Sequence, residues 1–98
     1  MSDDTRRDAR FVRSPHVLQR RTLDTFVLLG VDAQDPVVVG GTGADVWTLL
    51  AEARSLDDLV DLLAVHYTGD RAVIAADVSA LLDTFVHGGV ALVLPPPA

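Results

Sequence analysis

The residues with catalytic potential are few and widely separated along the chain. The three histidines are His16, His66 and His87, and no Asp or Glu stands at a recognisable metal-ligand spacing from them. The serines lie in no nucleophile-elbow motif, and the chain contains no cysteine, so disulfides and thiolate chemistry are excluded. The pattern predicts a protein that is not an enzyme and that uses no metal or other cofactor.

A glycine-rich segment is similar in pattern to a phosphate-binding loop. Gly40–Gly43 follows a strand-like run and opens a helix-like one. However, Val46 occupies the position of the third glycine of a dinucleotide loop, and no lysine follows as in a P-loop. Thr42 with Asp45 three residues later predicts a capping box instead, at the start of a helix over Ala44–Glu52.

A different chemistry is offered by the short run Val37-Val38-Val39, which follows Pro36. These β-branched residues form the last of three strand-like runs, so the strand can be the edge of a sheet. An edge strand exposes unpaired N–H and C=O groups that another chain can join as an added strand. The residues alone leave two interpretations open, an ordinary short strand and a binding edge.

The elements around this run predict an α+β fold. Strands are expected over Val17–Arg21, Thr25–Val31 and Val37–Val39, joined by short turns into an antiparallel meander. Thr25–Val31 is apolar on both faces and therefore central. Three helices should follow, the first with Trp47 in the core and the second opened by a capping box of Ser55 and Asp58.

The third helix is expected to end at Gly88-Gly89, and Val90–Leu94 then forms a short strand or an extended tail. Helices two and three with this segment are typical of a winged helix-turn-helix. We therefore expect an arm over residues 1–12, one domain over 13–94 and a tail over 95–98.

The third helix has a core face and a second face. The core face is predicted to consist of Ile74, Val78, Leu82 and Phe85. The second face carries Asp77, Ala80, Leu81 and Thr84. It is either an ordinary solvated face or one wall of a groove, in which Leu81 makes apolar contact, Ala80 leaves room and Asp77 pairs with a basic residue.

Charge is distributed unevenly. Residues 1–21 hold six arginines and three aspartates, a net charge of +3, whereas residues 22–98 hold two arginines and eleven acids, a net charge of −9. The acidic body disfavours nucleic acid and anionic membranes as partners. No apolar run approaches a membrane span, and the charged N-terminus is unlike a signal peptide, so a cytoplasmic location is expected.

Two blocks of sequence resemble the PqqD-like family of precursor-peptide recognition elements. They are Gly41–Leu50 (GTGADVWTLL) and Arg54–Val60 (RSLDDLV), preceded by a strand meander and followed by a long helix that ends in Gly-Gly-Val. The resemblance covers about residues 16–94 and rests on the two blocks together. It differs at Gly40-Gly41, where many members have Leu-Asn.

The resemblance implies that the chain binds the leader segment of a ribosomally synthesised precursor peptide. The leader joins the third strand as an added strand, packs against the third helix, and is presented to a modifying enzyme such as a radical-SAM protein, cyclase or protease. The residues implied for peptide binding are Val37, Val38, Val39, Gly40, Asp77, Ala80, Leu81 and Thr84. No cofactor is implied.

Two other functions are compatible with the predicted elements. A winged-helix transcriptional regulator would need basic and amide side chains on its recognition helix, but Asp70–Gly88 has a single arginine, Arg71, against three aspartates. A structural subunit could instead stabilise a partner enzyme without touching the peptide. Apolar strand edges in so small a domain are compatible with either a monomer or a homodimer.

Overall fold

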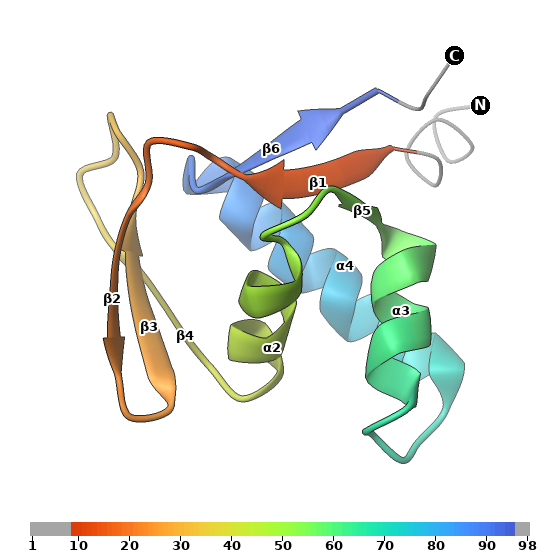
Figure 1. Ribbon diagram of the computed structural model, residues 1–98. Coiled ribbons are helices and arrows are strands. Elements are labelled where there is room, and N and C mark those ends of the chain that lie inside the picture. The colour runs from red at the N-terminus through yellow and green to blue at the C-terminus, as the bar shows by residue number, and fades with distance from the viewer. Residues whose placement is uncertain (1–8, 96–98) are drawn as a thin grey trace.

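Two small antiparallel sheets and a long helix organise the computed structural model, which describes residues 9–95 (Figure 1). Within that range the fold is α+β, as predicted, with two three-stranded sheets and three helices. In chain order the elements are β1 (Arg10–Arg13), β2 (Leu18–Thr22), β3 (Thr25–Leu29), β4 (Val37–Gly40), α2 (Thr42–Leu49), β5 (Arg54–Ser55), α3 (Leu56–Ala64), α4 (Arg71–His87) and β6 (Ala91–Leu94).

The predicted meander is the sheet β2-β3-β4. Its strands pair antiparallel in that order, with Leu18 opposite Leu29 and Val27 opposite Val38. β3 is central, as its apolar residues on both faces predicted. Leu23 and Asp24 form the two-residue turn between β2 and β3, and Leu23 adopts a φ of 45°.

The second sheet, in the order β5-β1-β6, was not predicted. The expectation of an arm over residues 1–12 is wrong for Arg10–Val12, because Arg10–Arg13 is β1 and pairs with both β5 and β6. Phe11 anchors this strand in the core at 4% exposure. Residues 1–8 of the expected arm and residues 96–98 of the expected tail lie outside the described range.

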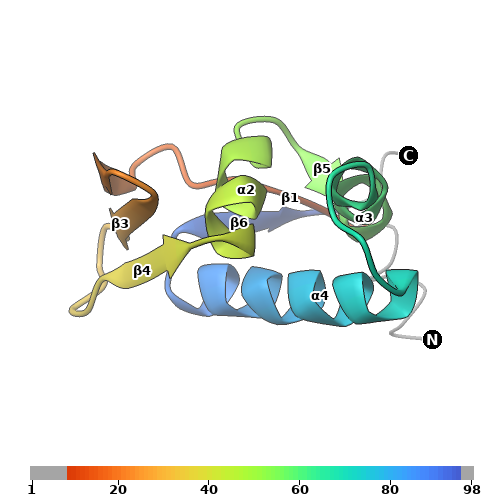
Figure 2. The ribbon, with the colours of Figure 1, turned by 90° about the horizontal axis from the view of Figure 1, so that it is seen from below.

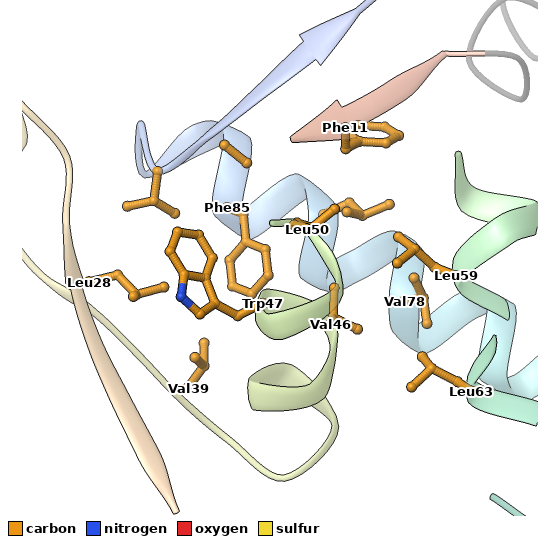
Figure 3. Packing of buried hydrophobic residues seen from close by; sticks show 13 residues of the cluster. Phe11, Leu28, Val39, Val46, Trp47, Leu50, Leu59, Leu63, Val78 and Phe85 are labelled. Carbon is orange, nitrogen blue, oxygen red and sulfur yellow. The ribbon is translucent and has the colours of Figure 1, made fainter. Parts of the chain in front are cut away.

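Trp47 lies at the centre of the core, as predicted, and is fully buried (Figure 3). Its ring packs edge to face on Phe85 with 5.8 Å between the centroids. The indole N–H donates to Gln19 Oε1 at 2.9 Å, so its one polar atom is satisfied by β2. Arg13 lies over the indole, with its guanidinium carbon 4.7 Å from the ring centroid, and donates to the Trp47 carbonyl.

The two predicted capping boxes have different outcomes. Ser55 and Asp58 cap α3 reciprocally, as predicted, since each side chain accepts from the other residue's backbone N–H. The box predicted for Thr42 and Asp45 is wrong. The helix starts two residues earlier, its N-cap is Gly41 at φ 55° and ψ −129°, and no side chain caps it. A backbone conformation that glycine favours takes the place of the side-chain cap.

The third helix follows the prediction closely. α4 ends at His87, with Gly88 as its C-cap, and β6 forms directly afterwards. Val78, Leu82 and Phe85 are buried, and Ile74 packs half-buried against the core. α4 therefore turns one face toward the core and leaves the opposite face exposed.

Candidate functional site

β4 is an edge strand of the meander sheet. It pairs with β3 on one side, and among the described residues no strand pairs with its other side. β4 carries no charged residue, and Val38 is 62% exposed. This edge therefore lacks the charged side chains that usually discourage strand addition.

The pairing fixes which backbone groups of β4 face outward. Thr22 and Thr25 close a two-residue turn, and such a closing pair exchanges both hydrogen bonds. Since these groups alternate along a strand, Phe26 and Leu28 direct theirs toward Val39 and Val37. The N–H and C=O groups of Val38 and Gly40 consequently point to the open edge.

The side chains of β4 alternate between the two faces of the sheet. Val39 is buried at 7% exposure and Val37 is half-buried, so both point toward the helices, whereas Val38 points to the opposite face. Figure 2 shows β4 beside the C-terminal end of α4. An added strand along β4 would therefore also meet this helix.

Two close approaches fix β4 against the helices, one at Gly88 after α4 and one at Gly43 of α2. A Cβ atom on Gly88 would lie 2.7 Å from Val37 Cγ2, so only a glycine allows the observed distance. At the other end of the strand, a Cβ on Gly43 would lie 3.1 Å from Val39 Cβ and 3.3 Å from Leu81 Cδ2. Leu81 thus packs beside the end of β4, and Gly88 beside its start.

A shallow groove of about 480 Å³ opens where β4 begins. Its floor and walls combine apolar and acidic groups. The residues lining it are Asp35, Pro36, Val37, Asp83, Thr84, His87 and Gly88.

The structure brings together most of the residues singled out from the sequence. Val37 and Thr84 line the groove, whereas Leu81 lies outside it, near Val39 at the other end of β4. Asp77 and Ala80 are exposed on α4, one turn before Leu81 and Thr84 respectively, but they do not line this groove. Val38 and Gly40 contribute backbone groups at the edge.

Sequence reasoning missed Asp35, Asp83, His87 and Gly88 as members of this site. Helical spacing from Thr84 would have indicated His87 and Gly88, which lie three and four residues further along. The glycine pair at the helix end was interpreted only as a stop signal. Asp35 comes from the β3–β4 turn, and no periodicity connects it to α4.

A second hollow, of about 550 Å³, lies between α2 and α3. Leu49, Leu62 and Leu63 line it, and the Tyr67 hydroxyl donates to the Asp45 carboxylate at its rim. That hydrogen bond raises the pKa of Tyr67. This hollow adjoins no open strand edge of the described chain, so it offers packing without backbone pairing.

Residues 9–95 show neither a metal-binding cluster nor a membrane-spanning helix. In that range no three His, Asp or Glu side chains gather where they could hold a metal ion. None of the three described helices is long and apolar enough to cross a membrane.

Comparisons with known proteins identify the fold and the family. No functionally curated protein matches the chain. A solved structure, TbiB1 in complex with the TbiA(beta) leader peptide, superposes with a TM-score of 0.72 over 82% of this chain and 93% of that one, at 22% identity. The family model of coenzyme PQQ synthesis protein D matches residues 25–90, from the start of β3 to the residue before β6. The chain belongs to the PqqD family.

Proposed function

We propose that this protein binds the leader segment of a ribosomally synthesised precursor peptide by strand addition at β4 and presents it to a modifying enzyme. The observation that carries the proposal is the uncharged open edge of β4 beside a groove on α4. Membership of the PqqD family supports it, as does the shared fold with TbiB1, which binds a leader peptide.

In this proposal the backbone supplies most of the affinity and the groove supplies the selectivity. The leader exchanges hydrogen bonds with Val38 and Gly40, and each bond contributes about 0.5–1.5 kcal/mol. Alternate leader side chains turn toward α4, where Val37 and Thr84 meet one and Leu81 meets the next. Asp77 and Ala80 extend this contact along the helix.

The protein acts as a non-catalytic adaptor in this scheme. Chemistry on the precursor belongs to the partner enzyme, a radical-SAM protein, cyclase or protease. The recognition domain spans residues 10–94, because β1 is part of the fold. We describe α3, α4 and β6 as a winged helix-turn-helix that binds peptide, since Asp77 and Asp83 make α4 unfavourable for phosphate.

The site can be tested by NMR with synthetic leader peptides taken from short open reading frames in the neighbourhood of this chain's gene. We expect leader addition to shift the amides of Val37–Gly41 and of α4 from Asp77 to Gly88. The β2 amides of Leu18–Thr22 serve as an internal control, because that strand is the sheet's other edge.

Binding with shifts confined to β2, or to the α2–α3 hollow, would contradict the proposed site. Salt-dependent binding of duplex DNA, without peptide binding, would favour a transcriptional regulator instead. Titration of the partner enzyme without any leader peptide separates an adaptor from a purely structural subunit. An adaptor should gain enzyme affinity when the leader is present.

A further inference from the structure

The outer face of the sheet β2-β3-β4 is unusually apolar. Strand alternation and the observed pairing assign eight positions to this face. Its members are Leu18, Arg20, Thr22, Thr25, Val27, Leu29, Val38 and Gly40. Leu18 is 69% exposed and Val38 is 62% exposed, while Val27 and Leu29 are half-buried between them.

The opposite face of the same sheet accounts for the remaining side chains. Gln19 bonds Trp47, Arg21 lies over the Phe26 ring, and Leu28 is fully buried. Figures 1 and 2 both show the three helices on that inner side. None of the described helices therefore covers Leu18, Val27, Leu29 or Val38.

A sheet with one solvated face normally alternates apolar inward and polar outward. Here four of the eight outward positions are large aliphatic residues, and Arg20 is the single charge among them. Opposed pairs Leu18–Leu29 and Val27–Val38 join them into a diagonal stripe across all three strands. The stripe is exposed at Leu18 and Val38 and half-buried between them, and a contiguous apolar surface of this kind indicates an interaction site.

We propose that this outer face docks the enzyme that modifies the precursor, and that the bound leader enlarges the docking surface. The part of the inference that concerns the bound leader rests on the proposed function. A leader strand added to β4 turns every second side chain to the outer face, directly beside Val38. The stripe then continues from β2 to the leader, so the full surface exists only in the loaded protein.

Charge determines the kind of partner that fits this face. No acid occupies an outward position of the three strands, so a second copy packed face to face would bury both Arg20 side chains without a counter-charge. A partner with an apolar patch and a carboxylate opposite Arg20 satisfies both features. Because Arg20 is the single charged residue among the outward positions, an acidic group on the partner gives electrostatic complementarity.

The experiment uses a precursor peptide that the protein binds and a purified modifying enzyme, both taken from the neighbourhood of this chain's gene. Affinity of the enzyme for the full-length protein is measured with and without saturating precursor, and leader affinity is measured separately. Two variants alter the face without touching the leader edge, the double variant L18T/V27T and the charge reversal R20E. V93T is the matched control, since Val93 is 50% exposed on β6 of the other sheet.

We expect L18T/V27T and R20E each to weaken enzyme binding about tenfold or more, as loss of a central contact does. V93T and the charge-preserving R20K should leave enzyme binding unchanged. Leader affinity should be the same in every variant, which also shows that each one folds.

Each other outcome has a defined meaning. Unchanged enzyme binding in both face variants would overturn this inference and leave the leader site intact. A wild-type protein that fails to bind leader overturns the proposed function, whereas loss of enzyme binding in the variants would then still support the face. A wild-type dimer that L18T/V27T converts to monomer identifies a second copy as the occupant and overturns the inference.

Discussion

The two edge strands of the sheet β2-β3-β4 both have unpaired backbone groups, but their side chains differ. Each edge leaves one side of a strand without a pairing partner in the described chain. β2 reads LQRRT, all five residues are exposed, and two arginines stand beside its free backbone groups. β4 reads VVVG, carries no charge and is half covered by α4.

The difference between the two edges indicates which of them is better suited to pair with a strand of another chain. Charged side chains on an edge strand discourage a neutral strand from pairing there, because pairing would desolvate them. At β4 the same pairing buries only valine, glycine and backbone, and α4 provides a wall for the incoming side chains. The β4 edge, which we propose as the leader site, is therefore the one that lacks charge and has a helix beside it.

The largest expected effect comes from proline substitutions on the two edges. V38P removes the outward N–H at the centre of β4 and places a ring where the leader backbone should pair. Loss of the N–H bond, together with the carbonyl bond that the ring keeps the leader from making, should weaken leader affinity about 30-fold or more, measured by calorimetry. Val38 gives no backbone bond to β3 in the derived pattern, so the domain should remain folded.

R21P is the matched control on β2. By the same alternation, the backbone groups of Arg21 point to the free edge of that strand, since those of Thr22 pair with Thr25. We expect R21P to leave leader affinity unchanged. If R21P weakened binding as much as V38P, the comparison between the edges would be wrong and β2 would be the better candidate.

The next effect tests the contact that sets α4 against β4. G88A places a methyl group about 2.7 Å from Val37 Cγ2, so strand and helix must move apart. Overpacking of this kind destabilises by about 1–3 kcal/mol, because the β-branched valine has little rotamer freedom to yield. Urea unfolding should show the loss of stability. Leader affinity should fall as well, because the groove on α4 is displaced relative to the edge of β4.

G40A is the control for that substitution. Its new methyl would meet nothing closer than 3.6 Å, an ordinary contact with Asp24 and Thr25. Stability of G40A should stay close to that of the parent protein. A G88A protein as stable as G40A, with unchanged leader affinity, would show that the β4–α4 spacing does not define the site.

The sequence predicted the sheet β2-β3-β4 and the helices, but it did not predict the sheet β5-β1-β6. The meander, the helices and the buried Trp47 follow from local periodicity and turn residues, which single segments express by themselves. β1 and β5 were missed because β5 has only two residues and β1 has an arginine at each end. Their strands are defined by partners more than 40 residues away along the chain.

The groove was missed in part for a related reason. Asp35 and His87 belong to different elements, and they line one hollow only because Gly88 lets α4 approach Val37. Periodicity placed Asp77, Ala80 and Thr84 on a face of α4 that is exposed, but Leu81 of the same predicted face is half-buried against the core. Such contacts depend on tertiary packing, which propensity does not encode.

A smaller effect distinguishes the two glycines that end β4. Gly41 has φ 55° and ψ −129°, a conformation that side chains with a Cβ rarely adopt, whereas Gly40 lies within the strand. G41A should therefore destabilise the domain by about 1 kcal/mol or more. Thermal unfolding beside G40A measures this difference. Equal stabilities would mean that the entry into α2 tolerates a non-glycine residue.

The smallest effect concerns the turn that joins β2 to β3. Leu23 holds a φ of 45° at 92% exposure, so its side chain gains little burial to offset the strain of a left-handed backbone. Asparagine tolerates this region and suits a two-residue hairpin, so L23N should stabilise the protein by about 0.5 kcal/mol in urea unfolding. Leader affinity at β4 should not change, because the substitution relieves strain in the turn without altering the edge. A loss of leader or enzyme binding in L23N would instead show that the exposed leucine is part of a contact, and that the β2 side of the sheet is less closed to partners than its arginines indicate.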